Sequence, residues 1–488
     1  MISFRPIARV TGVTLLIIGG LMLTCLPACW YYQSGGGGAL ALSALICFVL
    51  GVPGILLKPI NTKGVNKREG YLIVALGWLT MSLFGMLPFI FSGVLPNVTD
   101  AFFETASGFT TTGATVIVEI EGTPEGILLW RSLTHWIGGM GVIVLTVAIF
   151  PLLGIGGIEL FVAEAPGPTS DKVHPRIRET AKRLWLIYVA LTGLLTLLLF
   201  VEGMTFFDAI NHALSTMGTG GFSTKNSSIA YYTSPLIQYT LIVFMLIAGI
   251  NYTVIYYALK GRFQKVWSSD EFRAYLTLIL VLAVIITIGV HHSQVSTQSG
   301  QALEKSFRDG LFQLVSVVTT TGFISADYTS WSPGLTMLFF VLLFIGGCAG
   351  STAGGIKIVR HLVFFRNSFL EFKRLIHPRA IVPTKLNNEV IAGKILIHIF
   401  IFLLLYLIVF VIGSIVLSLL GIDFMTAIGA VASCLGNVGP GIGQVGPVDN
   451  FAWFSPEVKW VLAFIMLLGR LEIFTILVLF TPYFWKSN

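Results

Sequence analysis

The chain has 488 residues, of which 55% are hydrophobic and only 11% are charged, and its mean hydropathy is +0.86. A soluble globular domain carries about 25% charged residues, so this composition excludes an ordinary soluble enzyme or binding module. The formal net charge of +7 comes from basic residues that lie beside apolar segments, which favours a membrane orientation signal over a surface for nucleic acid.

Ten apolar segments approach the roughly 20 residues that a helix needs to cross a bilayer, so we predict an all-α polytopic membrane protein. Most Lys and Arg residues lie between these segments, near the N-terminus and within 58–68, 172–183, 260–273 and 357–394. The positive-inside rule places those stretches and both termini in the cytoplasm. The predicted spans are 10–30, 39–57, 71–93, 126–153, 184–201, 235–259, 272–290, 333–365, 391–420 and 457–484.

A pattern recurs four times between residues 71 and 484. Its copies read TDAFFETASGFTTTGAT, FFDAINHALSTMGTGGFS, FRDGLFQLVSVVTTTGFIS and IDFMTAIGAVASCLGNVGPG. Each has an Asp, a run of about 8–12 mostly apolar residues that is too short to span a bilayer, and a Gly-containing end. The regular recurrence indicates internal repeats. The Asp residues are Asp100, Asp208, Asp309 and Asp423, and the glycines are Gly113, Gly220, Gly322 and Gly439.

These copies predict four pseudo-repeats around a central pore. Each repeat is expected to contain a helix, a short re-entrant pore helix, an extended stretch and a second helix. The expected repeats are 69–165, 166–265, 266–375 and 376–488, and residues 1–68 are expected to form two extra N-terminal transmembrane helices.

The residue types within each repeat favour a cation pathway. Asp is a good helix N-cap, so each short helix is expected to begin at its Asp. The negative C-terminal ends of four such helices, pointing toward mid-membrane, favour a cation there. Irregular backbone at membrane depth is tolerated where it lines a cavity. Gly permits the conformations that turn carbonyl oxygens inward, and Thr hydroxyls are candidate further ligands.

The segments FTTTGAT, STMGTGGFS, TTTGFIS and LGNVGPGIG, in this order, resemble the four filter segments of the Trk/Ktr/HKT superfamily of potassium transporters. The resemblance covers 71–484, and the two additional N-terminal spans resemble the bacterial TrkH branch. It implies potassium uptake through a selectivity filter in the bacterial inner membrane, with potassium as the substrate and no organic cofactor on this chain. Gly rather than Ser at position 113 implies a preference for potassium over sodium.

The resemblance also implies partners and site residues. The chain is expected to form a homodimer in the lipid bilayer, to bind cytosolic TrkA-like nucleotide-binding regulatory subunits, and to bind no nucleic acid. Docking of such subunits is compatible with the basic segments 172–183 and 357–394. The expected potassium-binding filter residues are Thr111, Thr112, Gly113, Ala114, Gly218, Thr219, Gly220, Gly221, Thr320, Thr321, Gly322, Phe323, Asn437, Val438, Gly439 and Pro440.

The eighth apolar segment contains a dense cluster of glycines. Each Gly disfavours a helix by up to about 1 kcal/mol relative to Ala, which predicts an unwound intramembrane loop at 346–355. Close packing of small residues against a neighbouring helix is the alternative. The family resemblance implies a gate here. The candidate gate residues are Gly346, Gly347, Gly350, Ser351, Thr352, Gly354 and Gly355, together with Arg470.

Arg470 lies near the middle of the last predicted span. A charge at the centre of a transmembrane helix costs about 2.5–3.5 kcal/mol, so the side chain is expected to face the bundle interior, water or an anion. One interpretation places it beside the ion path near the glycine-rich loop, and the other is a buried structural ion pair. Glu472 is two residues away and on nearly the opposite face of a helix, so it is not an obvious partner.

Two other functions compete with a potassium pore. The first is a weakly selective or sodium-permeable cation channel of the same superfamily. The second is an intramembrane enzyme or a secondary transporter of another class. A secondary transporter favours inverted repeats with carboxylates in mid-span, whereas these repeats run in one direction and their Asp residues precede the short helices. Asp and Glu lie mostly outside the spans or at their ends, so no carboxylate pair suggests hydrolysis within the membrane, and we expect no enzymatic activity.

Overall fold

The computed structural model describes residues 4–57, 67–149, 177–296, 303–380 and 382–486. This described part of the chain is predominantly helical, and its one sheet is a hairpin of β1 (Lys385–Leu386) and β2 (Glu389–Val390). Among the described residues, six helices are long and apolar enough to cross a membrane, or up to eight if each of two bent pairs is one span. The prediction of an all-α polytopic membrane protein is confirmed.

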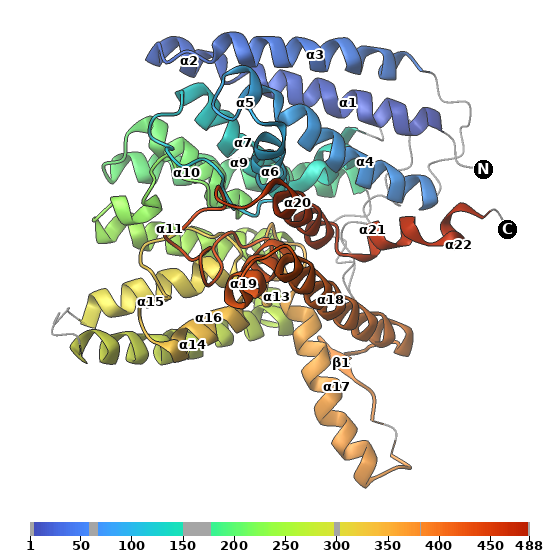
Figure 1. Cartoon of the computed structure of the whole chain (residues 1–488). Coiled ribbons are helices and arrows are strands. Elements are labelled where there is room, and N and C mark those ends of the chain that lie inside the picture. Colours follow the sequence, from blue (N-terminus) through green and yellow to red (C-terminus); the bar gives the residue numbers. More distant parts are fainter. Residues whose placement is uncertain (1–3, 58–66, 150–176, 297–302, 381, 487–488) are drawn as a thin grey trace.

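The first helices form a pair at one edge of the bundle, drawn in blue in Figure 1. They are α1 (Phe4–Leu23) and α3 (Gly37–Leu56), joined through the short α2 (Leu26–Tyr32). A Cβ atom at Gly12 would lie 2.6 Å from the carbonyl oxygen of Gly51 and 3.0 Å from the Cα of Gly54. Small residues at such positions let two helix backbones approach closely in a membrane. Helix α1 also packs on α4, which attaches the pair to the first predicted repeat.

Each predicted repeat contributes a long first helix, a short helix and an interrupted second helix. Repeat one contains α4 (Lys67–Gly85), α5 (Leu87–Phe91), α6 (Val98–Phe109) and α7 (Glu125–Ile149). Repeat two contains α9 (Ile177–Val201), α10 (Phe206–Gly218), η1 (Ser228–Tyr231), α11 (Pro235–Ala248), α12 (Tyr252–Leu259) and α13 (Phe263–Trp267).

The second half of the chain repeats this order. Repeat three contains α14 (Asp270–Ser296), α15 (Leu303–Val318), α16 (Pro333–Leu342) and α17 (Ile358–Ile376). Repeat four contains α18 (Gly393–Leu419), α19 (Phe424–Gly436), α20 (Pro456–Arg470), α21 (Phe474–Leu477), η2 (Val478–Phe480) and α22 (Pro482–Trp485). The repeat boundaries themselves stay a prediction.

The second helix is interrupted in all four repeats, whereas the sequence predicted this only in the third. Helix α7 has a non-helical residue at Gly141, with φ 68°. Helices α11 and α12 meet at 107°, and α20 and α21 meet at 108°. Loop 343–357 separates α16 from α17. The expectation of ten uninterrupted spans is therefore wrong in these places. Hydropathy is averaged over a window of residues and does not detect a bend within it.

The four Asp residues do not share one position, which corrects the expectation that each caps its helix. Asp423 is the N-cap of α19, and its carboxylate accepts the Thr426 N–H at 3.0 Å. The N-caps of α6 and α10 are instead Asn97 and Thr205, three residues before Asp100 and Asp208.

The third short helix begins earlier still, so Asp309 lies inside α15 rather than at its start. In repeats one to three the Asp lies 13 residues before a glycine of the extended stretch, counted to Gly113, Gly221 and Gly322. Thr426 lies 13 residues before Gly439, so Thr426 rather than Asp423 corresponds to the other three Asp residues.

Candidate ion pathway

The extended stretch after each short helix follows the same backbone path. In each stretch two residues, separated by one other, have a positive φ. The residue between them donates its backbone N–H to the carbonyl of a serine in the short helix. Four segments distant in sequence therefore share one local conformation. The φ pairs are Thr111 (53°) and Gly113 (82°), Thr219 (54°) and Gly221 (81°), Thr320 (54°) and Gly322 (79°), and Asn437 (54°) and Gly439 (100°). The N–H donors and serine acceptors are Thr112 and Ser107 (2.9 Å), Gly220 and Ser215 (3.0 Å), Thr321 and Ser316 (2.8 Å), and Val438 and Ser433 (3.0 Å).

This conformation corrects the predicted register of the second segment by one residue. Gly221 takes the place of Gly113, so Gly220 corresponds to Thr112. Gly218 is the last residue of α10 and not part of the extended stretch. The second window is therefore 219–222 instead of 218–221. Three glycines within four residues made the sequence alignment ambiguous. Gly220 has a separate role, because a Cβ atom there would clash with the ring of His135.

The four segments form a closed ring, because each filter glycine packs against a carbonyl oxygen of the next repeat. A Cβ atom at any of these glycines would clash with that oxygen. A positive φ and the absence of space for a Cβ atom together require glycine. The glycine and oxygen pairs, in order around the ring, are Gly113 and Gly220, Gly221 and Thr321, Gly322 and Val438, and Gly439 and Thr112.

A cavity of about 200 Å³ adjoins this ring. All four glycines of the ring line it, and Gly220 does not, in agreement with the corrected register. Asp449 and Lys225 also line it. Because each short helix ends directly before its extended stretch, four negative helix ends meet near the ring. Carbonyl oxygens and helix ends of this kind can replace the hydration shell of a cation.

Several filter hydroxyls bind the protein itself, which narrows the expectation that they are ion ligands. Thr112 Oγ1 lies 2.8 Å from Thr110 Oγ1 and accepts the Asn437 side-chain N–H at 3.0 Å. In repeat three, Thr321 Oγ1 lies 2.8 Å from Thr319 Oγ1. Backbone carbonyls are therefore better candidates for cation ligands than these hydroxyls.

The glycine-rich loop packs against the ends of two filter segments. The Gly354 N–H donates to Thr320 Oγ1 at 2.7 Å, and a Cβ atom at Gly354 would lie 2.8 Å from the Cβ of Asn437. The ends of the loop are joined by a bond from the Gly346 N–H to the Ile356 carbonyl at 2.9 Å. The predicted loop 346–355 is non-helical, and it contacts two of the four candidate filter segments.

Arg470 binds this loop, although it is not in the middle of a span. It is the last residue of α20, at the 108° bend. Its Nη1 donates to the Thr352 carbonyl at 2.9 Å, and its Nη2 donates to the carbonyls of Gly138 and, at 3.1 Å, Gly139 on α7. Bonds from one side chain thus connect the loop, repeat four and repeat one.

Glu472 has a partner that the helical pattern did not suggest. Its carboxylate forms an ion pair with Arg360 at the start of α17. Glu472 and Ile473 have φ of 55° and 56°, and a positive φ is unusual for a β-branched residue such as Ile473. The bend, which no sequence pattern indicated, brings Glu472 to Arg360.

Sequence reasoning also missed the contacts of Asp270 and Glu271. Glu271 Oε1 accepts the N–H of Ala349 within the loop at 2.7 Å and the N–H of Val359 at the start of α17 at 3.1 Å. Asp270 binds Arg366 of α17 at 2.5 Å. The sequence did offer one signal for these contacts, since two adjacent carboxylates stand inside a basic segment directly before a predicted span.

Comparisons with known proteins agree with this geometry. A sequence model of the TrkH family, described as a cation transport protein, matches residues 43–487. The Trk system potassium uptake protein TrkH of Salmonella typhimurium is 43% identical over 490 residues, covering 99% of this chain and 100% of that protein. The Trk system potassium uptake protein TrkG of Escherichia coli K12 is 34% identical and covers 99% of both chains.

A solved structure shows the same fold. The crystal structure of the potassium transporter TrkH from Vibrio parahaemolyticus matches with a TM-score of 0.88 and 38% identity, covering 99% of this chain and 100% of that one. Fold and ring together define a multi-pass cation transport protein. The chain belongs to the TrkH family. The resemblance to the Trk/Ktr/HKT superfamily is thereby confirmed.

Proposed function

We propose that this chain takes up potassium by conducting it through the ring formed by the four filter segments. The observation that carries this proposal is the closed order of contacts, in which each filter glycine faces a carbonyl oxygen of the next repeat. The full-length relatives named potassium uptake proteins support it. The work done is replacement of hydration by carbonyl oxygens, so the chain catalyses no covalent reaction and needs no organic cofactor of its own.

Rubidium flux tests this function, because rubidium replaces potassium in such filters. Liposomes that contain the purified chain and are loaded with potassium should accumulate radioactive rubidium, with the outward potassium gradient as the driving force. External potassium should suppress the uptake, and the same concentration of sodium should not. Protein-free liposomes are the control. Uptake equal to that control would contradict the proposal.

A weakly selective or sodium-permeable pathway is the second candidate function. It is favoured by one departure from symmetry, since Asn437 stands where the other three segments have Thr. Its amide nitrogen is bound to Thr112 Oγ1 and, at 3.0 Å, to the Met466 carbonyl. Equal suppression of rubidium uptake by sodium and potassium would favour this candidate.

We further propose that loop 346–355 and Arg470 form a gate on the cytoplasmic side of the filter. The loop lies against Thr320 and Asn437, so its displacement would change access to the ring. Arg470 supports the closed position through its bond to Thr352. Such a two-state element responds to any partner that binds one of its states better.

We also propose a homodimer in the bacterial inner membrane, with both termini cytoplasmic, regulated by TrkA-like nucleotide-binding subunits. The relatives are named as parts of a Trk system. The start of α1 and the end of α22 lie on the same side of the bundle in Figure 1, and Arg68 Nη1, at the start of α4, donates to the Lys486 carbonyl at 2.8 Å on that side. Part of the basic segment 172–183 lies outside the described residues, whereas 357–394 includes α17.

Helix α17 offers a surface for self-association. It extends away from the bundle in Figure 1 and exposes a stripe of apolar side chains at Phe369, Phe372 and Ile376 (71%, 64% and 72% exposed). We expect light scattering of the detergent-solubilised chain to give the mass of two chains. Phe369→Lys is expected to lower the dimer fraction, because a charge would then lie within the apolar stripe. A parent chain with the mass of one copy would contradict the proposed homodimer.

A further inference from the structure

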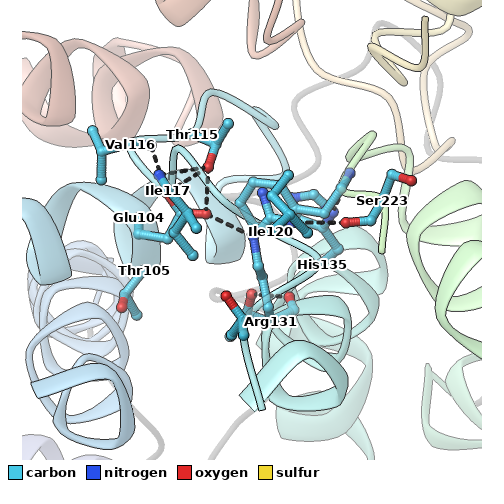
Figure 2. Close-up of polar contacts among 12 residues, drawn as sticks. Glu104, Thr105, Thr115, Val116, Ile117, Ile120, Arg131, His135 and Ser223 are labelled. Carbon is cyan, nitrogen blue, oxygen red and sulfur yellow. Dashed lines mark hydrogen bonds and ion pairs between the residues drawn. The ribbon is translucent and has the colours of Figure 1, made fainter. Parts of the chain in front are cut away.

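A buried ion pair lies behind the first two filter segments. Glu104 is on α6, nine residues before Gly113, and Arg131 is on α7; their side chains are 0% and 2% exposed. Arg131 Nε donates to Glu104 Oε1 at 2.7 Å. Figure 2 shows the two side chains among the polar contacts that surround them. Neither residue belongs to the filter itself, so their burial as charges needs a separate explanation.

The carboxylate of this pair holds the backbone just beyond the first filter glycine. Glu104 Oε2 accepts the Val116 N–H at 2.9 Å. The Thr115 hydroxyl lies 3.0 Å from both carboxylate oxygens and donates to them (Figure 2). Hydrogen bonds to an ionised carboxylate are shorter and stronger than neutral ones. The position of residues 115 and 116, two and three residues after Gly113, therefore depends on Glu104.

The guanidinium of the same pair holds the second filter segment. Arg131 Nη1 donates to the Ser223 carbonyl at 3.0 Å, and its guanidinium carbon lies 3.5 Å above the centre of the Phe222 ring. The His135 ring, one turn further along α7, also stacks on Phe222 with centroids 3.9 Å apart. Phe222 and Ser223 directly follow Gly221. One ion pair thus connects the chain after two neighbouring filter glycines.

The positions that correspond to Glu104 in the other three repeats form no such ion pair. His212, nine residues before Gly221, contacts Ser223 Oγ through Nε2 at 2.9 Å. Gln313, nine residues before Gly322, donates from Nε2 to Ser325 Oγ at 3.2 Å. Ala430, nine residues before Gly439, has no polar side-chain atom. The first three repeats share a polar support for the segment after the glycine, and repeat one alone uses an ion pair that reaches a second repeat.

A buried ion pair contributes little net stability compared with apolar residues of similar volume, although loss of one partner alone is strongly destabilising. Its effect here is geometric, because its hydrogen bonds fix two backbone segments relative to each other. We propose that Glu104 and Arg131 are positioning residues for ion selectivity. They hold the segments after Gly113 and Gly221 at the separation that lets the carbonyls of Thr112 and Gly220 prefer potassium over sodium. This inference rests on the proposed potassium conduction.

The test is a double variant, Glu104→Gln with Arg131→Met, which removes both charges and so leaves no unpaired buried ion. The readout is the ratio of rubidium to sodium uptake in liposomes. We expect this ratio to fall at least fivefold while rubidium uptake itself persists. A structural role alone would change the yield and the unfolding temperature but not this ratio.

The matched control is Asp100→Asn with Lys459→Met. It removes another ion pair of α6, with Lys459 Nζ 2.7 Å from Asp100 Oδ1. We expect its uptake ratio to stay within twofold of the parent. A folded Glu104→Gln/Arg131→Met variant with the parental ratio would overturn the positioning role. Absence of rubidium uptake by the parent would instead reject the proposed function.

Thr115→Val decides the question if the double variant does not fold. It removes only the hydroxyl that donates to Glu104 and leaves the ion pair in place. We expect a two- to threefold fall in the ratio of rubidium to sodium uptake, with an unfolding temperature near that of the parent. An unchanged ratio in folded Thr115→Val would then overturn the proposal.

Discussion

Serine in place of Gly113, Gly221, Gly322 or Gly439, one at a time, is expected to lower the preference for potassium over sodium at least tenfold. Each glycine has a positive φ, which costs other L-residues about 1–2 kcal/mol. Each also packs against a carbonyl oxygen of the next repeat, with which a Cβ atom would clash. The backbone must shift to relieve the clash, and the shift moves the oxygens that would bind the ion.

Competition between sodium and potassium during rubidium uptake measures this effect. Gly193→Ser is the matched control, because Gly193 lies on α9 and an added Cβ atom would have no atom within 4 Å apart from its chain neighbours and the adjacent backbone of its own helix. Its selectivity should equal that of the parent. Unchanged selectivity in all four folded filter variants would place the ion path elsewhere.

The second large effect is expected at the proposed gate. Deletion of Gly347–Ala353, or Arg470→Ala, should raise rubidium uptake in the absence of a regulatory subunit at least tenfold without changing ion preference. The deletion is sterically feasible because the Gly346 N–H is already bound to the Ile356 carbonyl, so the ends of the loop are adjacent. The arginine variant removes the bonds to Thr352, Gly138 and Gly139.

Loss of the positive charge of Arg470 should raise rubidium uptake further. A unit charge 4 Å from a permeating cation raises its energy by about 4 kcal/mol at an effective dielectric constant near 20. Arg470→Lys is the informative companion variant, since it keeps the charge but loses the planar fork that reaches several carbonyls. Its uptake should lie between those of the parent and Arg470→Ala. Uptake at or below the parental level in both the deletion and the alanine variant, with folded protein at matched amounts, would remove the gating role from both.

The sequence by itself was sufficient to predict the class of fold and, to within one residue, the four candidate filter segments. Composition indicated a helical membrane protein, and the recurrence of an apolar run before glycine located segments 111–114, 320–323 and 437–440. The glycine density at 346–355 predicted a break in the helix, and α16 does end at Leu342. These features are local: they depend on the types and spacing of neighbouring residues, which can be read directly from the sequence.

Only the tertiary structure decided the features that depend on partners distant in the chain. The register of the second segment was ambiguous until the positive φ of Gly221 and the clash at Gly220 with His135 distinguished the two glycines. The N-caps at Asn97 and Thr205 replaced the expected Asp residues, since neighbouring polar residues cap a helix nearly as well. Spacing along the chain could not separate these alternatives.

The ion pairs were beyond sequence reasoning for the same reason. Glu104 is 27 residues from Arg131, and Glu472 is 112 residues from Arg360. A periodic pattern predicts which side chains share a helix face, but not which other helix that face will meet. The bend after Arg470 places its side chain against the loop and α7. Hydropathy does not predict that bend. Residue type therefore determined what each segment can do, and packing between repeats decided which groups act together.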